Sequence, residues 1–415
     1  MRFSETLVAL RYPAFRRLFI GQAISVTGSM MQSAALLWHV ALLVPAEDRG
    51  TALGLVGLSR FVPICLFALW GGVVADSVDR VKLMLRTQVA LLGVAALLGV
   101  LTFAGLATPL LIYALSAVGA AATAFDAPAR QSLAPTLVPR EHLPNAVSLN
   151  VVVFQVASVA GPALGGLLIG SFGAGQSGVA WVYALNAASF LAVVIALAGM
   201  PAAAPPEPTT QSGLHAAVEG FRFVFGTPLL RSTMLLDFFA TFFSSATFLL
   251  PMMALDPTLL GVGPEAYGWL QAAPAVGAAL TSAVMVPALA RLDRRGVVLL
   301  VAVVGYGLAT VLFGVARSLM IAFLALFLTG VFDTISMTIR HVLRQLHTPD
   351  HLRGRMTGVN MIFFMGGPQL GEFEAGIVAR LTSAPVSVIS GGVACVVSTL
   401  WIAWRDRELR AYRGR

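Results

Sequence analysis

This chain has few charged residues and almost no cysteine. Only 11% of its 415 residues are charged, whereas 58% are hydrophobic. Soluble globular domains are about 25% charged, and a single soluble fold does not need so much apolar sequence. The two cysteines, Cys65 and Cys395, both lie in apolar runs, which argues against a disulfide framework or a zinc site. The composition therefore predicts an integral membrane protein.

Motifs for several kinds of chemistry are missing as well. No glycine-rich loop is followed by lysine, so we do not expect ATP-driven transport within this chain. His341, His347 and His351 have no carboxylate or cysteine cluster with them, which predicts solvated side chains and no metal site. No spans share a nucleophile and a base, so we expect neither an enzyme nor a cofactor. The first apolar run is too long for a signal peptide and lacks a small-residue cleavage site.

About a dozen apolar segments are long enough to cross a bilayer, which takes roughly 20 residues per helix. The many glycines and prolines suit membrane helices, which pack through small residues and tolerate kinks. We predict an all-α integral membrane protein with twelve transmembrane helices in two pseudo-symmetric six-helix bundles. The predicted spans are 18–43, 51–75, 83–105, 109–126, 146–169, 179–199, 229–253, 267–289, 297–315, 318–338, 357–379 and 386–404.

Most of the 27 Lys and Arg residues fall at the termini and in alternate loops, and Arg340 and Arg344 count among these loop charges. The intervening loops hold only Arg49, Arg317 and Arg380. Positive residues gather in cytoplasmic loops, so both termini are predicted to be cytoplasmic in a plasma (bacterial inner) membrane. The net charge of +8 is mostly this excess, and its place in short loops excludes nucleic-acid binding.

The sequence divides into two halves and a linker. The predicted units are an N-terminal bundle (1–199), a cytoplasmic linker (200–228), a C-terminal bundle (229–404) and a basic tail (405–415). The linker begins with a stiff Pro-rich stretch. Apolar residues at helical spacing follow, which predicts an amphipathic helix on the membrane surface; a disordered linker is the alternative.

The two halves also repeat one another. Phe125-Asp126 matches Phe332-Asp333, and Gly161-Pro162 matches Gly367-Pro368. Transporters built from such repeats place the substrate site at the interface between the halves.

The loop after the second span resembles the signature loop of the major facilitator superfamily. Asp76 and Arg80 match that pattern, whereas Ser77 and Asp79 depart from it. The resemblance implies a cytoplasmic latch in which the carboxylate faces a helix N-terminus, where the dipole favours negative charge. The alternative is that Asp76 is a solvated loop charge.

The fifth span is similar to the motif of exporters in this superfamily. Gly161, Pro162, Gly165 and Gly166 match it, and Ala157 replaces its first glycine. Pro162 removes a backbone hydrogen bond and bends the helix, and the glycines allow close helix approach. Ordinary small-residue packing would explain the same residues.

Further segments resemble the enterobactin-exporter-like (transmembrane secretion effector) branch of the superfamily, which includes siderophore exporters and macrolide efflux proteins. That resemblance implies proton-driven export and a central cavity, and it leaves the substrate open. The matching segments are 125–131, 138–141, 332–340, 348–355 and 371–376.

Ionisable residues inside a span are costly and are candidates for function. Asp237 is the first candidate for proton coupling; a static polar tie between helices is the alternative. Glu372 and Glu374 point to different faces of their span. Either one could pair with Arg60 as an outer gate or as a permanent ion pair.

Two charge pairs lie near the cytoplasmic ends of their spans, and each pair shares one helix face. They are Asp126 with Arg130 and Asp333 with Arg340. We expect an inner charge network that holds the halves together; substrate contact is the alternative.

Aromatic residues supply candidates for a substrate cavity. They are Trp38, His39, Phe238 and Phe242. Lipid contact or helix packing is the alternative for the phenylalanines. We predict a monomeric, proton-coupled exporter of small amphipathic molecules, drug-like or siderophore-like. An uptake symporter and a non-transporting receptor or scaffold are the alternatives.

Overall fold

The computed structural model describes residues 7–200, 214–244, 246–289, 293–349 and 352–414. Within these ranges the secondary structure is helical and contains no strand, which confirms the all-α membrane fold. The chain forms two compact units. The first unit comprises Met1–Leu43, Ser59–Thr210 and Gly263–Gly268, and the second comprises Val44–Leu58, Gln211–Val262 and Trp269–Arg415.

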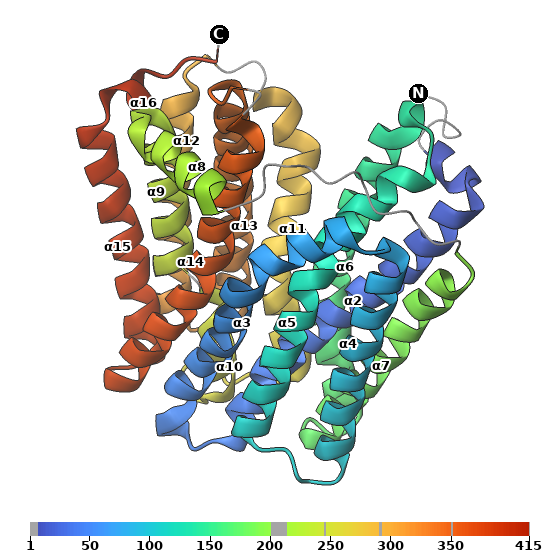
Figure 1. Ribbon diagram of the computed structural model, residues 1–415. Coiled ribbons are helices and arrows are strands. Elements are labelled where there is room, and N and C mark those ends of the chain that lie inside the picture. Colours follow the sequence, from blue (N-terminus) through green and yellow to red (C-terminus); the bar gives the residue numbers. More distant parts are fainter. Residues whose placement is uncertain (1–6, 201–213, 245, 290–292, 350–351, 415) are drawn as a thin grey trace. The chain divides into compact units, whose positions relative to one another are not determined.

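The first unit is built on α2, which packs against α6 and α7, and on α4, which packs against α5 and α7 (Figure 1). Its helices and short 3₁₀ turns are η1 (Val8–Arg11), α2 (Pro13–Leu43), the later part of α3 (Arg49–Ser77), α4 (Arg80–Phe103), α5 (Pro109–Leu133), η3 (Ala134–Leu137), η4 (Arg140–His142), α6 (Leu143–Ser171) and α7 (Gln176–Ala198).

The second unit centres on α12, which packs against α13 and α15, and on α9, which packs against α14 and α15. Its elements are η2 (Ala46–Asp48), the start of α3, α8 (Leu214–Gly226), α9 (Pro228–Phe243), η5 (Ala246–Leu249), α10 (Leu250–Leu255), most of α11 (Pro264–Leu289), α12 (Arg295–Val315), α13 (Leu319–Leu346), α14 (Arg353–Leu381), α15 (Ala384–Arg405) and α16 (Arg407–Ala411).

Local signals in the sequence fix where many helices begin. Helices α2, α5, α9 and α11 each start at a proline, whose missing N–H costs nothing in the first turn. Asp79, Ser318 and Ser383 accept backbone N–H bonds at the starts of α4, α13 and α15. Such caps satisfy donors that have no partner inside the helix.

Ten segments among the described residues are long and apolar enough to cross a membrane. Helices α11 and α14, of 26 and 29 residues, have the length to supply two more. The seventh predicted span is not one continuous helix. Helix α9 ends at Phe243, and the chain continues through η5 into α10. Pro251 lies in the first turn of α10, where a proline is tolerated, whereas it would break the interior of a longer helix.

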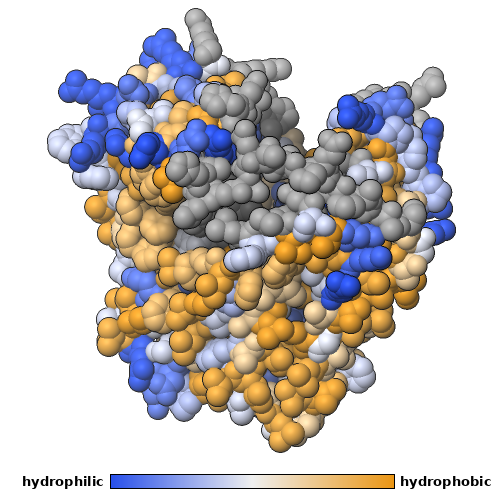
Figure 2. All heavy atoms as spheres, in the orientation of Figure 1, coloured by the Kyte–Doolittle hydropathy of each residue, from blue (hydrophilic) through white to orange (hydrophobic). Residues whose placement is uncertain are grey.

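Large apolar side chains cover the outer faces of the helices. Figure 2 shows hydrophobic residues over the middle of the visible surface and hydrophilic residues mainly toward the helix ends. Leu110, Ile195, Met320, Leu381 and Trp404 are among the most exposed. In a soluble protein such surface would promote association; in a membrane it contacts lipid.

Helix α8 occupies the end of the predicted linker, whose Pro-rich part (201–213) lies outside the described residues. Val224 is fully buried, and Glu219 forms an ion pair of 2.5 Å with Arg355 of α14. Val218 and Phe221 are exposed. The helix therefore has one face against α14 and a second apolar face outward. Its place on the membrane surface stays a prediction.

Candidate transport site

Asp237 lies in α9 between two arginines of α13. Its side chain is 7% exposed, and Oδ1 lies 3.0 Å from Nη1 of Arg340. Oδ2 accepts a hydrogen bond of 3.0 Å from Nη2 of Arg344, which also donates to the Thr233 carbonyl. The arginines are one helical turn apart and share a face of α13. A buried carboxylate is tolerated because two guanidinium groups compensate it.

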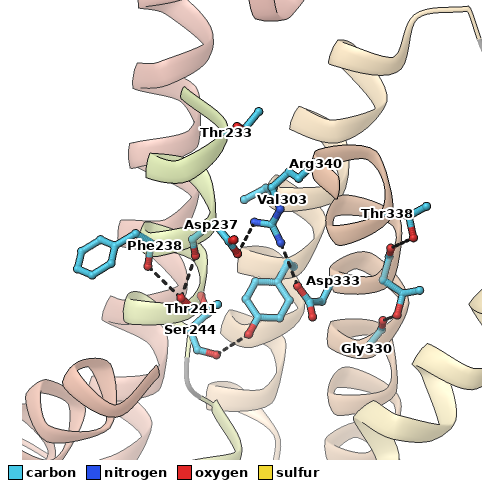
Figure 3. Close-up of polar contacts among 12 residues, drawn as sticks. Thr233, Asp237, Phe238, Thr241, Ser244, Val303, Gly330, Asp333, Thr338 and Arg340 are labelled. Atoms are coloured by element: carbon cyan, nitrogen blue, oxygen red, sulfur yellow. Dashed lines mark hydrogen bonds and ion pairs between the residues drawn. The ribbon is translucent and has the colours of Figure 1, made fainter. Parts of the chain in front are cut away.

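Arg340 also contacts a second carboxylate. Its Nη2 lies 3.5 Å from Oδ1 of Asp333, which lies about two turns earlier on the same face of α13. Figure 3 shows the guanidinium group pointing between Asp237 and Asp333. The Asp333 side chain is 46% exposed, whereas that of Arg340 is only 2% exposed. The buried Arg340 thus contacts both a buried carboxylate, Asp237, and a partly exposed one, Asp333.

Asp333 opens onto a cavity of about 220 Å³ in the second unit. A second carboxylate, Glu372, and several hydroxyls also line it. The Tyr306 hydroxyl donates to the Ser244 carbonyl at 3.0 Å, where α9 ends. Thr241 donates to the backbone carbonyl of Asp237 within α9, one helical turn away. The lining comprises Thr241, Ser244, Thr247, Pro274, Tyr306, Thr329, Gly330, Asp333, Pro368 and Glu372.

The first unit contains a different cavity, of about 250 Å³; among the described residues its lining includes Arg60 and no acidic side chain. Two amides form part of its wall: Asn186 Nδ2 donates to Gln32 Oε1 at 2.7 Å, and Ser189 donates to Asn186 Oδ1 at 2.9 Å. The lining comprises Ser29, Gln32, Ser33, Leu36, Arg60, Ile64, Leu91, Val94, Leu98, Leu115, Ser116, Gly119, Ala120, Thr123, Asn186 and Phe190.

Asp126 of α5 is sealed by hydrogen bonds. Its side chain is 4% exposed, and Oδ1 accepts bonds of 2.9 Å from both Thr87 and Gln88 of α4. Arg130 lies 3.8 Å away and is itself 36% exposed. The structure therefore brings Asp126 and Arg130 together, and it adds two neutral partners that the sequence analysis did not identify.

The signature loop has a local explanation for one of its departures. Asp79 caps α4 by accepting hydrogen bonds from the Val81 and Lys82 amides. An aspartate before a helical segment is a recognised cap signal, and it could have been found in the sequence. Arg80 donates to the Ser132 carbonyl at 3.2 Å. The Asp76 side chain lies outside the described residues, so its latch role stays a prediction.

The glycines of α6 lie against neighbouring backbone. A Cβ on Gly161 would stand 2.5 Å from that of Met30, and one on Gly165 would stand 3.1 Å from Met31 Cγ. A Cβ on Gly166 would collide with the Pro264 carbonyl at the start of α11. Pro162 is buried within the helix. Close helix approach in this unit thus requires the small residues.

The aromatic candidates line neither of the two cavities. Trp38 is buried with its ring 4.8 Å from that of Tyr267. His39 is buried, with Nδ1 3.2 Å from the Tyr183 hydroxyl. Phe238 and Phe242 stack on each other at 5.4 Å. These are packing contacts between side chains, and the role of the four residues in substrate binding stays a prediction.

One assignment from the sequence is wrong. Arg340 and Arg344 were counted as loop charges, yet both are buried within α13, which extends to Leu346. The spacing of Arg340 in the sequence predicted that it shares a face with Asp333, and Arg344, one turn further along, continues that face by the same periodicity. Sequence reasoning missed Arg344 as a partner of Asp237, together with Asn360, which accepts a hydrogen bond from Arg344.

A single family of membrane proteins accounts for nearly the whole chain, because residues 4–411 match the transmembrane secretion effectors. This chain belongs to the transmembrane secretion effector family. Relatives of this chain include the enterobactin exporters EntS of Citrobacter koseri and Shigella boydii, 28% and 27% identical over 405 residues. The match covers 97% of this chain and 94% of each relative. The predicted family is confirmed, and the chain is a multi-pass membrane transporter.

Solved transporter structures share the fold of this effector. The nucleoside transporter NupG superposes with a TM-score of 0.75 at 12% identity, covering 94% of this chain and 99% of NupG. A bacterial homologue of the iron transporter ferroportin gives 0.69 at 17% identity, covering 95% and 99%. At these identities the likeness concerns the fold alone.

Proposed function

We propose that this transporter exports small amphipathic molecules of the siderophore or drug class in exchange for protons, by alternating access. The chain of contacts from Asp237 through Arg340 to Asp333 carries the proposal. A buried arginine shared by two carboxylates responds to the charge of either one, because its attraction to each depends on that charge. Asp333 faces a cavity, so a proton can reach it.

Asp333 is the proton acceptor in this scheme, and Asp237 is the anchor. Two arginines hold Asp237, and the helices around it bury it. Protonation of Asp333 removes one of the two carboxylate partners of Arg340. Arg340 then pairs with Asp237 alone, and its ion pair with Asp333 within α13 is lost. Proton binding thereby changes the packing of α13 against α9.

Glu372 and Glu374 have secondary roles in this scheme. Glu372 lines the same cavity and is a second proton site. Glu374 is half-buried and does not line that cavity. The outer gate of Arg60 with Glu372 or Glu374 stays a prediction. The enterobactin exporters among its relatives support export over uptake.

The test uses everted plasma-membrane vesicles with an acidified interior. Labelled siderophores and macrolides should accumulate inside only while the proton gradient lasts, and an ionophore should abolish the uptake. Asp293→Asn, an exposed acid outside the cluster, is the matched control and should behave as wild type.

Gradient-independent uptake would remove proton coupling from the account. Accumulation in right-side-out vesicles only would favour the symporter alternative. A lack of transport for every compound, with the protein present in the membrane, would favour a receptor or scaffold.

A further inference from the structure

The last turn of helix in the second unit is docked on its neighbours. The short helix α16 packs against α12 and α15, and its Leu409 is fully buried. The Gly296 amide donates to the Tyr412 carbonyl at 3.1 Å, and the Gly414 amide donates to the Asp293 carbonyl at 3.0 Å. A Cβ on Gly296 would collide with the Leu409 carbonyl. The C-terminal segment therefore has a fixed position at the start of α12.

Docking leaves the arginines of this segment on the outside. Four of them are exposed: Arg405, Arg407, Arg410 and Arg413. None of the four forms an ion pair with an acid among the described residues. Glu408 is exposed beside them, whereas Asp406 caps α16. The loop before α12 adds one exposed residue of each sign, Asp293 and Arg294. The surface as a whole is positive.

The apolar outer face of α15 leads directly to these arginines. Four exposed residues recur there at the spacing of helical turns: Val393, Val397, Leu400 and Trp404. Trp401 is exposed as well, and the guanidinium carbon of Arg405 lies 5.5 Å from the centroid of its ring. Tryptophans at the end of a membrane helix lie at the level of the lipid headgroups. Cation–π attraction therefore holds Arg405 at that level.

The order of these side chains matches the order of groups in a phospholipid. Aliphatic residues meet the acyl chains, the tryptophans follow, and the arginines reach the phosphate, which a guanidinium group binds through two N–H bonds. Figure 2 shows hydrophilic residues at the end of the unit that carries α16 and hydrophobic ones toward its middle. A signal for topology needs only the charges. The fixed position of α16 is therefore a separate observation, and it favours binding of a defined group.

We propose that the ends of α15 and α16 bind the headgroup of an anionic phospholipid. The site consists of Trp401, Trp404, Arg405, Arg407 and Arg410. Arg405 binds the phosphate from its place on Trp401, and Arg407 and Arg410 lie one turn apart on α16 and add positive charge. The bound lipid joins the ends of α12 and α15, because α16 packs on both. This inference concerns contact with the membrane and holds whatever molecule the transporter exports.

The test is native mass spectrometry of the full-length transporter in nonionic detergent. The probes are dioleoylphosphatidylglycerol (anionic) and dioleoylphosphatidylcholine (zwitterionic). For the first bound lipid we expect phosphatidylglycerol to bind at least about tenfold more tightly, because each basic residue at headgroup level adds to its attraction. The triple variant Arg405→Gln, Arg407→Gln and Arg410→Gln should reduce this preference to less than about threefold.

A matched triple variant controls for total charge. Arg11→Gln, Arg16→Gln and Arg17→Gln remove the same charge from exposed positions of the first unit. The preference for phosphatidylglycerol should then stay within about twofold of the wild type. Equal losses in the two triple variants would show that net charge alone attracts the lipid, and this would overturn the site.

The docking of α16 is tested with every arginine in place. Leu409→Ser removes the buried anchor, so the arginines lose their fixed positions, and phosphatidylglycerol should bind about threefold to tenfold more weakly. This variant decides the matter if the triple variant of the site does not insert into the membrane. Unchanged binding in Leu409→Ser, or no preference between the two lipids in the wild type, would overturn the proposal. Transport is not measured in any of these experiments, so failure of the proposed export function leaves their outcome unaffected.

Discussion

Asp126 and Asp333 occupy matching positions in the two sequence repeats, yet their surroundings differ. Asp126 is 4% exposed and accepts hydrogen bonds from Thr87 and Gln88. Asp333 is 46% exposed, lines a cavity and contacts a buried arginine. Asp126 is held by neutral hydrogen-bond donors, whereas Asp333 faces a cavity and an ion-pair partner. The two repeats thus have a carboxylate at matching positions in different surroundings.

The largest expected effect concerns the anchor of this cluster. Asp237→Ala leaves Arg340 and Arg344 buried without their shared carboxylate, so we expect a loss of about 3–5 kcal/mol of stability. Asp126→Ala should cost less, about 1–3 kcal/mol, because its partners are neutral donors and a half-exposed arginine. Thermal and denaturant unfolding in detergent compare the two. Equal losses would contradict the contrast between the halves.

The matching glycines of the two repeats offer a second comparison. A Cβ on Gly371 would collide with the backbone carbonyl of Phe242, whereas one on Gly165 would stand 3.1 Å from Met31 Cγ and 3.2 Å from the Met31 carbonyl oxygen, which smaller shifts relieve. Gly371→Ala should therefore destabilise by about 1–3 kcal/mol, and Gly165→Ala by less than about 1 kcal/mol. The melting temperatures of the two variants check this order, and a larger drop for Gly165→Ala would reverse it.

Substitution of the arginines beside Asp333 and Asp126 tests the same contrast, with smaller expected effects on transport. Arg340→Lys keeps the charge and loses the fork that reaches both carboxylates, so we expect proton-driven transport to fall about tenfold. Arg130→Lys should change transport less than about twofold, because Arg130 is partly solvated and makes one loose pair. Initial rates in everted vesicles measure both. Similar rates in the two variants would show that the fork is dispensable.

The sequence supports the fold well and the site only in part. Apolar length predicted the helices, because a helix that crosses the bilayer needs roughly 20 apolar residues. The break after Phe243 was missed, because Pro251 lies eight residues further on, in the first turn of α10. Asp237, Arg340 and Asp333 were each identified, but the pairing of Arg340 with Asp237 depends on how α9 packs against α13. That packing is set by side-chain shape over the whole unit, which one sequence does not reveal.

The contrast between Asp333 and Asp126 is tested most directly by compound-driven proton release from acid-loaded everted vesicles. The account predicts that Asp333→Asn abolishes the release at wild-type protein levels and that Asp126→Asn preserves it. Release that survives in Asp333→Asn, or that disappears in Asp126→Asn with the protein still folded, would contradict the assignment of proton coupling to the second unit.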